Sequence, residues 1–218
     1  MFAKLNLNYL NPDIQIYTIN THEEILDELV KVTLSTSTTE FSERIKKINN
    51  PLIQRQSIAG RYLLVKSNGI DFNSIICDHT IGYTKWKKPF FKEGRTSFNI
   101  SHSKNIVMLA QSNEALVGVD IQARIEVNNA IVKRILSQEE FSKVFRRNNN
   151  TESFFELWTS KESILKNYGC GLSGGIKNVK IFYDQKTLKP KWGIFKNQIY
   201  RLYAVSCPLG FTGMVAVR

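Results

Sequence analysis

One acidic residue lies inside an apolar, β-branched segment of the chain. The segment Leu116–Ile121 predicts a buried strand, because β-branched residues favour sheets and a fully buried strand is almost continuously apolar. An unpaired carboxylate there would cost several kcal/mol, so we expect Asp120 to meet a cation or a metal ion. The alternative is a strand-end aspartate that caps a turn. Gln122 would lie on the same face of the strand as Asp120.

Strands and helices recur in both halves of the sequence. Helical spacing and capping residues predict helices over 22–33 (with Thr21 as N-cap), 51–66, 138–145 (opened by the capping box Ser137–Glu140) and 152–168 (ended by Gly169). Short apolar runs predict strands over 98–100, 106–111, 116–121, 176–183, 191–195, 199–205 and 212–217. This order favours an α+β fold with antiparallel sheets over one parallel sheet. A seam near 112–116 would divide an N-terminal half, 1–113, from a C-terminal half, 114–218.

The net charge of +11 is concentrated in one part of the chain. Residues 44–104 contain twelve Lys and Arg against three acidic residues, whereas residues 1–43 contain two lysines and seven acidic residues. A basic block favours a polyanionic partner, which could be nucleic acid, a phosphorylated small molecule or an acidic protein. The simpler alternative is a solvated basic surface.

The sequence argues against three classes of protein. The longest uninterrupted apolar run, 106–110, is far shorter than the roughly 20 residues of a membrane span. The first ten residues lack the basic-then-apolar pattern of a signal peptide. The cysteines, Cys77, Cys170 and Cys207, lie far apart, so neither a disulfide framework nor a structural zinc site is predicted. We expect a reducing, cytoplasmic setting.

Two glycine motifs overlap after residue 168. Gly169–Gly174 matches the pattern of dinucleotide-binding loops, and Gly171–Gly175 matches that of hydrolase nucleophile elbows. Both patterns require a strand before the glycines and a helix after them, whereas here a helix comes first. We therefore predict neither site, and expect the glycines to end the helix and to let the backbone approach a ligand.

A second carboxylate lies on the helix predicted over 152–168. Trp158, Glu162 and Lys166 are four residues apart and so share one side of that helix. A surface Glu–Lys pair is the alternative interpretation. Because this side begins with a tryptophan beside the apolar stripe, we expect Glu162 at the edge of the core, with Lys161 and Lys166 near it. Two carboxylates from separate elements, together with lysines, suit Mg²⁺ and phosphate.

A strand that ends in Ser101-His102-Ser103 is the third polar feature. Its hydroxyls and imidazole could face a ligand, although a histidine at a strand end is often simply hydrogen-bonded. A Ser/His/Asp hydrolase is disfavoured, because neighbouring residues of a strand point to opposite faces.

Four of these segments, taken in order, resemble the Sfp-type 4′-phosphopantetheinyl transferase family. They are Phe98–Ser103 (FNISHS), Val117–Gln122 (VGVDIQ), Trp158–Lys166 (WTSKESILK) and Gly169–Leu172 (GCGL). The spacing of 42 residues between Asp120 and Glu162 also fits the family. Lys87–Phe90 and the helix that carries Arg55 and Arg61 resemble its looser upstream motifs.

The resemblance implies an activity and a fold. Such enzymes move the 4′-phosphopantetheine arm of coenzyme A to a serine of an apo acyl or peptidyl carrier protein and release adenosine 3′,5′-bisphosphate. The implied fold has two similar α/β halves related by a pseudo-twofold axis, each with a small antiparallel sheet packed on helices. Coenzyme A would lie between the halves of a monomer.

The resemblance also implies residue roles. Asp120, Glu162 and Gln122 would hold Mg²⁺ or Mn²⁺, and Glu162 would be the general base. The other implied contacts are Lys161 and Lys166 with the pyrophosphate, His102 with a coenzyme A phosphate, Lys88 and Pro89 with the adenine, Ser101 near the adenine, and Arg55 or Arg61 with the 3′-phosphate. Many members have glutamate where this chain has Gln122, and an amide oxygen ligates a metal without contributing charge.

Two other functions remain open at this point. Trp86 and Phe90 among the lysines of 85–92 are typical of single-stranded nucleic-acid binding, which would leave Asp120 and Glu162 unexplained. Gln122 leaves open an inactive homologue that binds carrier proteins. We expect a transferase without a nucleic-acid or membrane partner.

Overall fold

The computed structural model describes residues 3–6, 13–35, 39–70, 80–94, 96–145, 150–171 and 175–218. The chain divides into two compact units, Met1–Glu114 and Ala115–Arg218, and this boundary lies inside the predicted seam. Cys77 and the part of the glycine motif at 172–174 lie outside the described residues. Each unit contains antiparallel sheets and helices, as an α+β fold requires. The pseudo-twofold relation stays a prediction.

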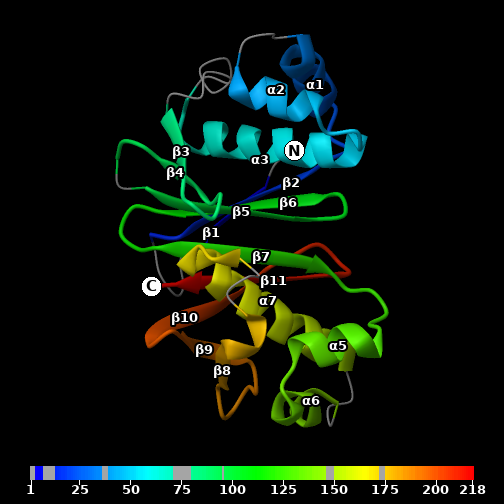
Figure 1. The fold of residues 1–218 in the computed structure, drawn as a ribbon, viewed down its shortest axis with the longest axis vertical. Helices are drawn as coiled ribbons and strands as arrows, with labels where there is room; N and C mark the ends of the chain where they lie inside the picture. The colour runs from blue at the N-terminus through cyan, green and yellow to red at the C-terminus, as the bar shows by residue number, and fades with distance from the viewer. Residues whose placement is uncertain are drawn as a thin grey trace. The chain divides into compact units, whose positions relative to one another are not determined.

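The N-terminal unit contains a four-stranded antiparallel sheet in the order β1-β2-β6-β5 (Figure 1). Its strands are β1 (Ala3–Asn6), β2 (Gln15–Asn20), β5 (Ser97–Ser103) and β6 (Ile106–Ser112). Helix α3 (Pro51–Ser67) packs on β2, β5 and β6, and α1 (Ile25–Ser35) packs on α3 and on α2 (Glu40–Lys46). Strands β3 (Ile81–Tyr83) and β4 (Pro89–Phe91) pair with each other as a separate hairpin.

The two helix starts predicted in this unit had different outcomes. The start of α3 agrees with the prediction, because Pro51 is its first residue and the Asn50 side chain accepts hydrogen bonds from two backbone N–H groups. The prediction of Thr21 as an N-cap is wrong, because α1 begins at Ile25. Thr21 instead offers its carbonyl oxygen to Arg55 Nε, and the segment between β2 and α1 is a turn.

The C-terminal unit contains a five-stranded antiparallel sheet in the order β7-β11-β10-β9-β8 (Figure 1). Its strands are β7 (Val117–Ala123), β8 (Lys180–Tyr183), β9 (Pro190–Phe195), β10 (Gln198–Val205) and β11 (Phe211–Val217). The long helix α7 (Asn150–Tyr168) packs on β7, β11, β9 and β8, and α6 (Gln138–Phe145) contacts α7. Helix α5 (Asn129–Ile135) contacts the 3₁₀ helix η3 (Ile176–Asn178), which replaces the start of the strand predicted over 176–183.

Aromatic side chains of α7 belong to the core of this unit. Phe154 packs edge-to-face on Phe155 and on Trp158, with ring centroids 5.3 and 5.5 Å apart, and Tyr168 packs edge-to-face on Phe195 at 5.2 Å. The predicted stripe on this helix therefore does face the core. Phe154, Phe155 and Trp158 belong to α7 itself, whereas the contact of Tyr168 with Phe195 links the end of α7 to β9.

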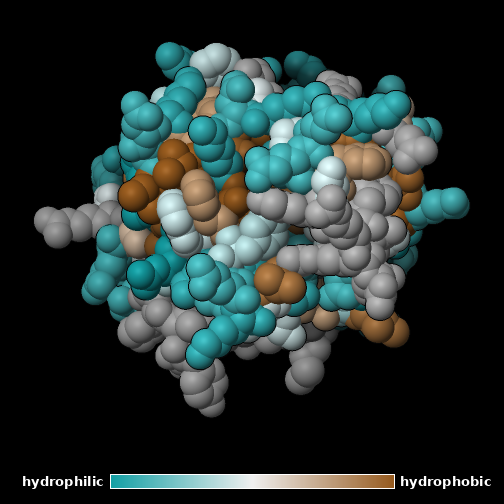
Figure 2. Space-filling model, turned by 90° about the horizontal axis from the view of Figure 1, so that it is seen from below, coloured by the Kyte–Doolittle hydropathy of each residue, from teal (hydrophilic) through white to brown (hydrophobic). Residues whose placement is uncertain are grey.

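Figure 2 shows one face of the molecule, on which apolar side chains gather in a few patches among hydrophilic ones. Within the described ranges, no helix combines the length and the apolar character needed to cross a membrane.

Candidate active site

A glycine brings the backbone of α7 into direct contact with β7. A Cβ atom on Gly118 would lie 2.2 Å from the carbonyl oxygen of Ser163 and 2.3 Å from the backbone nitrogen of Asn167. No side chain fits there, so the face of β7 that contains position 118 lies against the helix. Since alternate residues of a strand share a face, Asp120 and Gln122 also lie on the side of α7.

The end of α7 is anchored to the same sheet by an amide. Asn167 is buried, and its Nδ2 donates to the carbonyl oxygens of Leu116, at 2.7 Å, and Ala216, at 2.9 Å. These acceptors lie just before β7 and in β11. The side chain therefore fixes the position of α7 along β7, one residue after Lys166.

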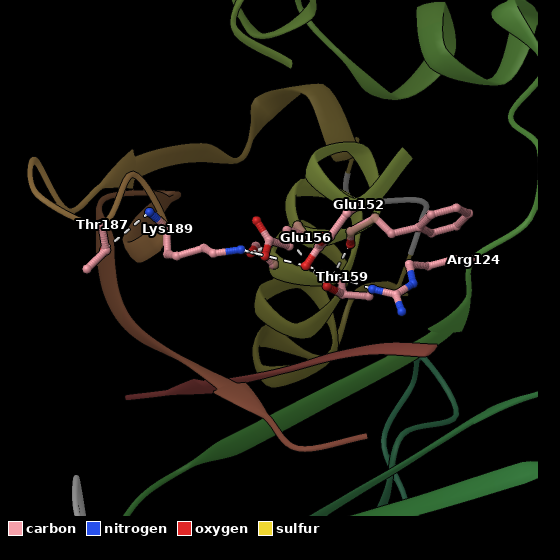
Figure 3. Close-up of polar contacts among 8 residues, drawn as sticks. Arg124, Glu152, Glu156, Thr159, Thr187 and Lys189 are labelled. Atoms are coloured by element: carbon pink, nitrogen blue, oxygen red, sulfur yellow. Dashed lines mark hydrogen bonds and ion pairs between the residues drawn. The ribbon is translucent and has the colours of Figure 1, made fainter. Parts of the chain in front are cut away.

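Ion pairs anchor the beginning of α7. Figure 3 shows Glu152 and Glu156, one turn apart on the helix, facing Arg124 and Lys189. Glu152 Oε1 lies 3.8 Å from Arg124 Nη1 and 3.8 Å from Lys189 Nζ, and Lys189 also pairs with Glu156. Sequence reasoning missed this cluster. The i, i+4 spacing of the glutamates was a signal for it, but their partners follow β7 and precede β9, far away in sequence.

Between these anchors, two carboxylates and a lysine meet below the surface. Asp120 is 1% exposed and Glu162 is 6% exposed. Asp120 Oδ1 accepts a hydrogen bond from Lys166 Nζ at 2.6 Å, and Asp120 Oδ2 accepts one from Gln122 Nε2 at 3.2 Å. The structure thus brings together four of the predicted residues, and Asp120 has the cation that its burial required.

Glu162 has an unusual protonation equilibrium. Burial, and then the nearby carboxylate of Asp120, raise the pKa of Glu162 to about 7, although the ammonium group of Lys166 lowers this pKa. Glu162 Oε1 is buried and has no hydrogen-bond partner among the described residues. The group can therefore take up or release a proton near neutral pH, and one oxygen is available to a ligand.

The donor set fits a hard divalent cation. Among the residues that the structure describes, no three His, Cys, Asp or Glu side chains gather as metal ligands, so the available donors are the two carboxylates and the Gln122 amide. Mg²⁺ is commonly held by one or two carboxylates together with substrate phosphates and water. The buried, unpartnered oxygen of Glu162 is consistent with this use.

The raised pKa of Glu162 makes stability depend on pH. Its folded-state pKa lies above the ordinary 4.5, so its contribution to stability is complete below about pH 4.5 and is lost as the pH rises to about 7. In a chelator, we expect Glu162→Gln to become more stable than the unchanged chain across this window, by about 3 kcal/mol at pH 8. Urea unfolding of both proteins from pH 4 to 8 measures this difference. A difference that stays constant with pH would contradict the raised pKa.

Lys161 does not lie with these residues. Its side chain is 0% exposed, and its Nζ donates to Glu140 Oε2 at 2.7 Å and to the carbonyl oxygen of Ile135 at 3.4 Å. The predicted contact of Lys161 with a pyrophosphate disagrees with this position, because the ammonium group is enclosed and already paired. Adjacent residues of a helix point about 100° apart, so Lys161 and Glu162 face different elements.

In the N-terminal unit, two predicted residues line one pocket. Arg61 and Pro89 contribute to a pocket of about 200 Å³. Two further basic residues line it: Arg44, which sequence reasoning missed, and Lys87, which the upstream motif contains without a predicted role. The guanidinium of Arg61 lies 4.5 Å from the centre of the Phe41 ring. The pocket is thus basic and aromatic. A larger pocket, of about 640 Å³, contains no residue predicted to bind a ligand.

The other predicted residues of this unit are placed differently. Arg55 is held by the turn before α1, through an ion pair with Asp27 and a 2.6 Å hydrogen bond to Thr21, so its prediction as a phosphate contact disagrees with its position. On β5, Ser101 is buried whereas His102 is exposed, as expected for neighbours on a strand. Lys88 is half-buried beside Pro89.

Comparison with known proteins identifies the part of the chain that holds the carboxylates. Residues 116–201 match the family model of the 4′-phosphopantetheinyl transferase superfamily. This segment is similar to the members of that superfamily. It begins at β7 and includes α7, so Asp120, Glu162 and Lys166 all lie within the matched range of the superfamily.

Individual relatives extend the similarity. The chain is 33% identical to 4′-phosphopantetheinyl transferase gsp of Aneurinibacillus migulanus over 56% of its own length and 55% of the relative's. It is 37% identical to 4′-phosphopantetheinyl transferase Sfp of Bacillus subtilis over 35% and 34% of the two chains. It is 24% identical to 4′-phosphopantetheinyl transferase ffp of Bacillus subtilis over 73% and 72%. The chain thus spans about half of gsp and about a third of Sfp.

Proposed function

We propose that this protein transfers the 4′-phosphopantetheine group of coenzyme A to a serine of an apo carrier protein, with the help of Mg²⁺. The observation that carries the proposal is the buried pair Asp120–Glu162 with Lys166 beside it, inside a segment of the 4′-phosphopantetheinyl transferase superfamily. Relatives named as such transferases support the same reaction. The cytoplasmic location, the monomeric state and the absence of a nucleic-acid partner stay predictions.

In the proposed reaction, Glu162 takes the proton of the carrier serine. The serine oxygen forms a bond to the phosphorus that bears the pantetheine arm. The bond from that phosphorus to the bridging oxygen breaks, and its electron pair leaves with adenosine 3′,5′-bisphosphate. A glutamate carboxylate is one of the groups that commonly accept a proton in this way.

Asp120, Glu162 and Gln122 would hold the Mg²⁺, which would neutralise charge on the pyrophosphate when bound. Lys166 supplies a second positive charge at the same place, because it lies against Asp120. The pocket that contains Arg61, Lys87 and Pro89 would take the adenine and the 3′-phosphate, since cationic and aromatic groups together suit a nucleotide. Arg44 is added to the predicted set on the same grounds.

Intact mass spectrometry tests the reaction. The chain is incubated with coenzyme A, Mg²⁺ and several apo carrier proteins, and we expect one or more carriers to gain the mass of the phosphopantetheine group. Absence of a mass gain on every carrier would overturn the proposal. Tight, strongly salt-dependent binding of RNA or DNA that coenzyme A does not displace would favour the nucleic-acid alternative instead.

Gln122→Glu tests the role of the amide in the donor set. We expect transfer to be retained or raised and half-saturation to occur at lower Mg²⁺, because a third carboxylate adds charge to the site. The hydrogen bond from Gln122 Nε2 to Asp120 would be replaced by repulsion, so the variant should be less stable in a chelator. Activity against Mg²⁺ concentration and urea unfolding measure these effects. A large loss of activity at saturating Mg²⁺ would contradict the assignment.

A further inference from the structure

The enclosed ion pair between Lys161 and Glu140 connects α7 to α6. Lys161 is fully buried, and its Nζ lies 2.7 Å from Glu140 Oε2. Leu136 and Val144, which lie on either side of Glu140 in sequence, belong to the core of the C-terminal unit. An ammonium group without contact with water needs a counter-ion. Glu140 supplies it, so neither side chain can move without leaving a buried charge unpaired.

The same carboxylate also holds the turn between α5 and α6. Glu140 Oε2 accepts a hydrogen bond from the backbone nitrogen of Ser137 at 2.8 Å, and Ser137 Oγ accepts one from the backbone nitrogen of Glu140 at 3.2 Å. This is the capping box that the sequence predicts. Lys161 Nζ adds its bond to the carbonyl oxygen of Ile135. One lysine thus fixes the end of α5 and the start of α6 to α7.

This anchor lies directly before the reactive carboxylate. Lys161 and Glu162 are consecutive, so a rotation of α7 that releases Lys161 from Glu140 also moves Glu162 away from Asp120. The two other anchors, at Asn167 and at Glu156, fix the ends of the helix. Lys161 fixes its rotation at the level of Glu162.

We propose that Lys161 is a positioning residue, which sets the place of Glu162 through its bond to Glu140, and that it does not contact coenzyme A. This inference rests on the proposed function where it is tested by kcat. The melting temperature and the Kd for coenzyme A test it without any transfer reaction. A lysine that bound pyrophosphate would have to be free of Glu140. A lysine that positions Glu162 must keep its bond to Glu140, because this bond fixes the rotation of α7.

Three variants of the full chain separate these roles. Glu140→Gln leaves Lys161 in place without its counter-ion, and Lys161→Met removes the ammonium group. E140Q/K161M removes both charges and keeps an amide oxygen at position 140 that can still accept from the backbone nitrogen of Ser137. We expect each single variant to lower the melting temperature by roughly 5–15 °C and kcat by about 10–100-fold, with the KM for coenzyme A changed less than about threefold. We expect the double variant to regain most of both losses. Glu126→Gln, which removes an exposed glutamate of the same unit, is the control and should change neither quantity.

Several results would overturn the inference. A tenfold rise in the KM or calorimetric Kd for coenzyme A in Lys161→Met, with Glu140→Gln unaffected, would place Lys161 on the ligand. A double variant with restored melting temperature but without restored kcat would show that the charge itself takes part. If the unchanged chain modifies no carrier, the proposed function fails, but the melting temperatures and the calorimetric Kd for coenzyme A still test the inference. A weaker Kd in Lys161→Met overturns it. An unchanged Kd together with destabilised single variants supports it.

Discussion

Glu162→Gln is expected to reduce phosphopantetheine transfer by about 10²–10⁴-fold while the protein stays folded. The amide cannot accept the serine proton, and general base catalysis contributes rate factors of this size. Replacing the Glu162 carboxylate by an amide also removes the burial penalty and the repulsion from Asp120, which together raise the pKa of Glu162. The loss should therefore appear in kcat, with circular dichroism unchanged and a melting temperature at pH 8 equal to or above that of the unchanged chain.

Glu126→Gln is a suitable control, because it removes an exposed glutamate from the same unit. It should leave kcat within about twofold, as expected for a surface substitution away from the site. Near-normal turnover of the Glu162→Gln variant would mean that another group takes the proton. In that case the pair Asp120–Glu162 would lose its proposed catalytic role.

Gly118→Ala is expected to have the largest effect on folding. The added methyl group would lie 2.2 Å from the Ser163 carbonyl oxygen, and the opposing atoms are backbone, so no side chain can move aside. Forced separation of α7 from β7 should cost about 3 kcal/mol or more, which is the upper range for overpacking. The C-terminal unit should unfold at a much lower urea concentration or fail to fold, which tryptophan fluorescence measures.

Gly60→Ala provides the contrast within α3. There the added methyl group would lie 3.0 Å from Ile100 Cγ2, the nearest atom and part of a side chain, and alanine is favoured over glycine in a helix by up to about 1 kcal/mol. We expect a change within about 1 kcal/mol of zero. Equal effects of the two substitutions would contradict the close approach of α7 to β7.

The sequence allowed the central carboxylates to be predicted for identifiable reasons. Asp120 stood out because a charge interrupted a β-branched strand, and Glu162 and Lys166 shared the side of a helix that began with Trp158. The strand prediction used a continuous β-branched run and the helix prediction used a period of 3.6 residues, and the structure has β7 and α7 at these places. The helix α3 and the capping box at Ser137 were predictable for the same local reason.

The partners of long side chains could not be predicted in this way. Lys161 precedes Glu162, but the direction that its side chain takes depends on α6, which is brought beside it by tertiary packing. Arg44 and Lys87 meet Arg61 only because α2 and the β3–β4 hairpin fold back near α3. Short elements such as β3, β4 and α5 were missed, since a few residues carry too little periodicity to predict an element.

The strand order of the C-terminal sheet has a consequence for biosynthesis. β7 carries Asp120 and pairs along its whole length with β11, the final strand in sequence. On the ribosome, β7 emerges early and must wait for β11 before its backbone groups are paired. A nascent or truncated chain that lacks β11 therefore exposes an apolar strand with an acidic residue at its centre, and we expect this unit to complete its folding slowly and only after β11 has been synthesised.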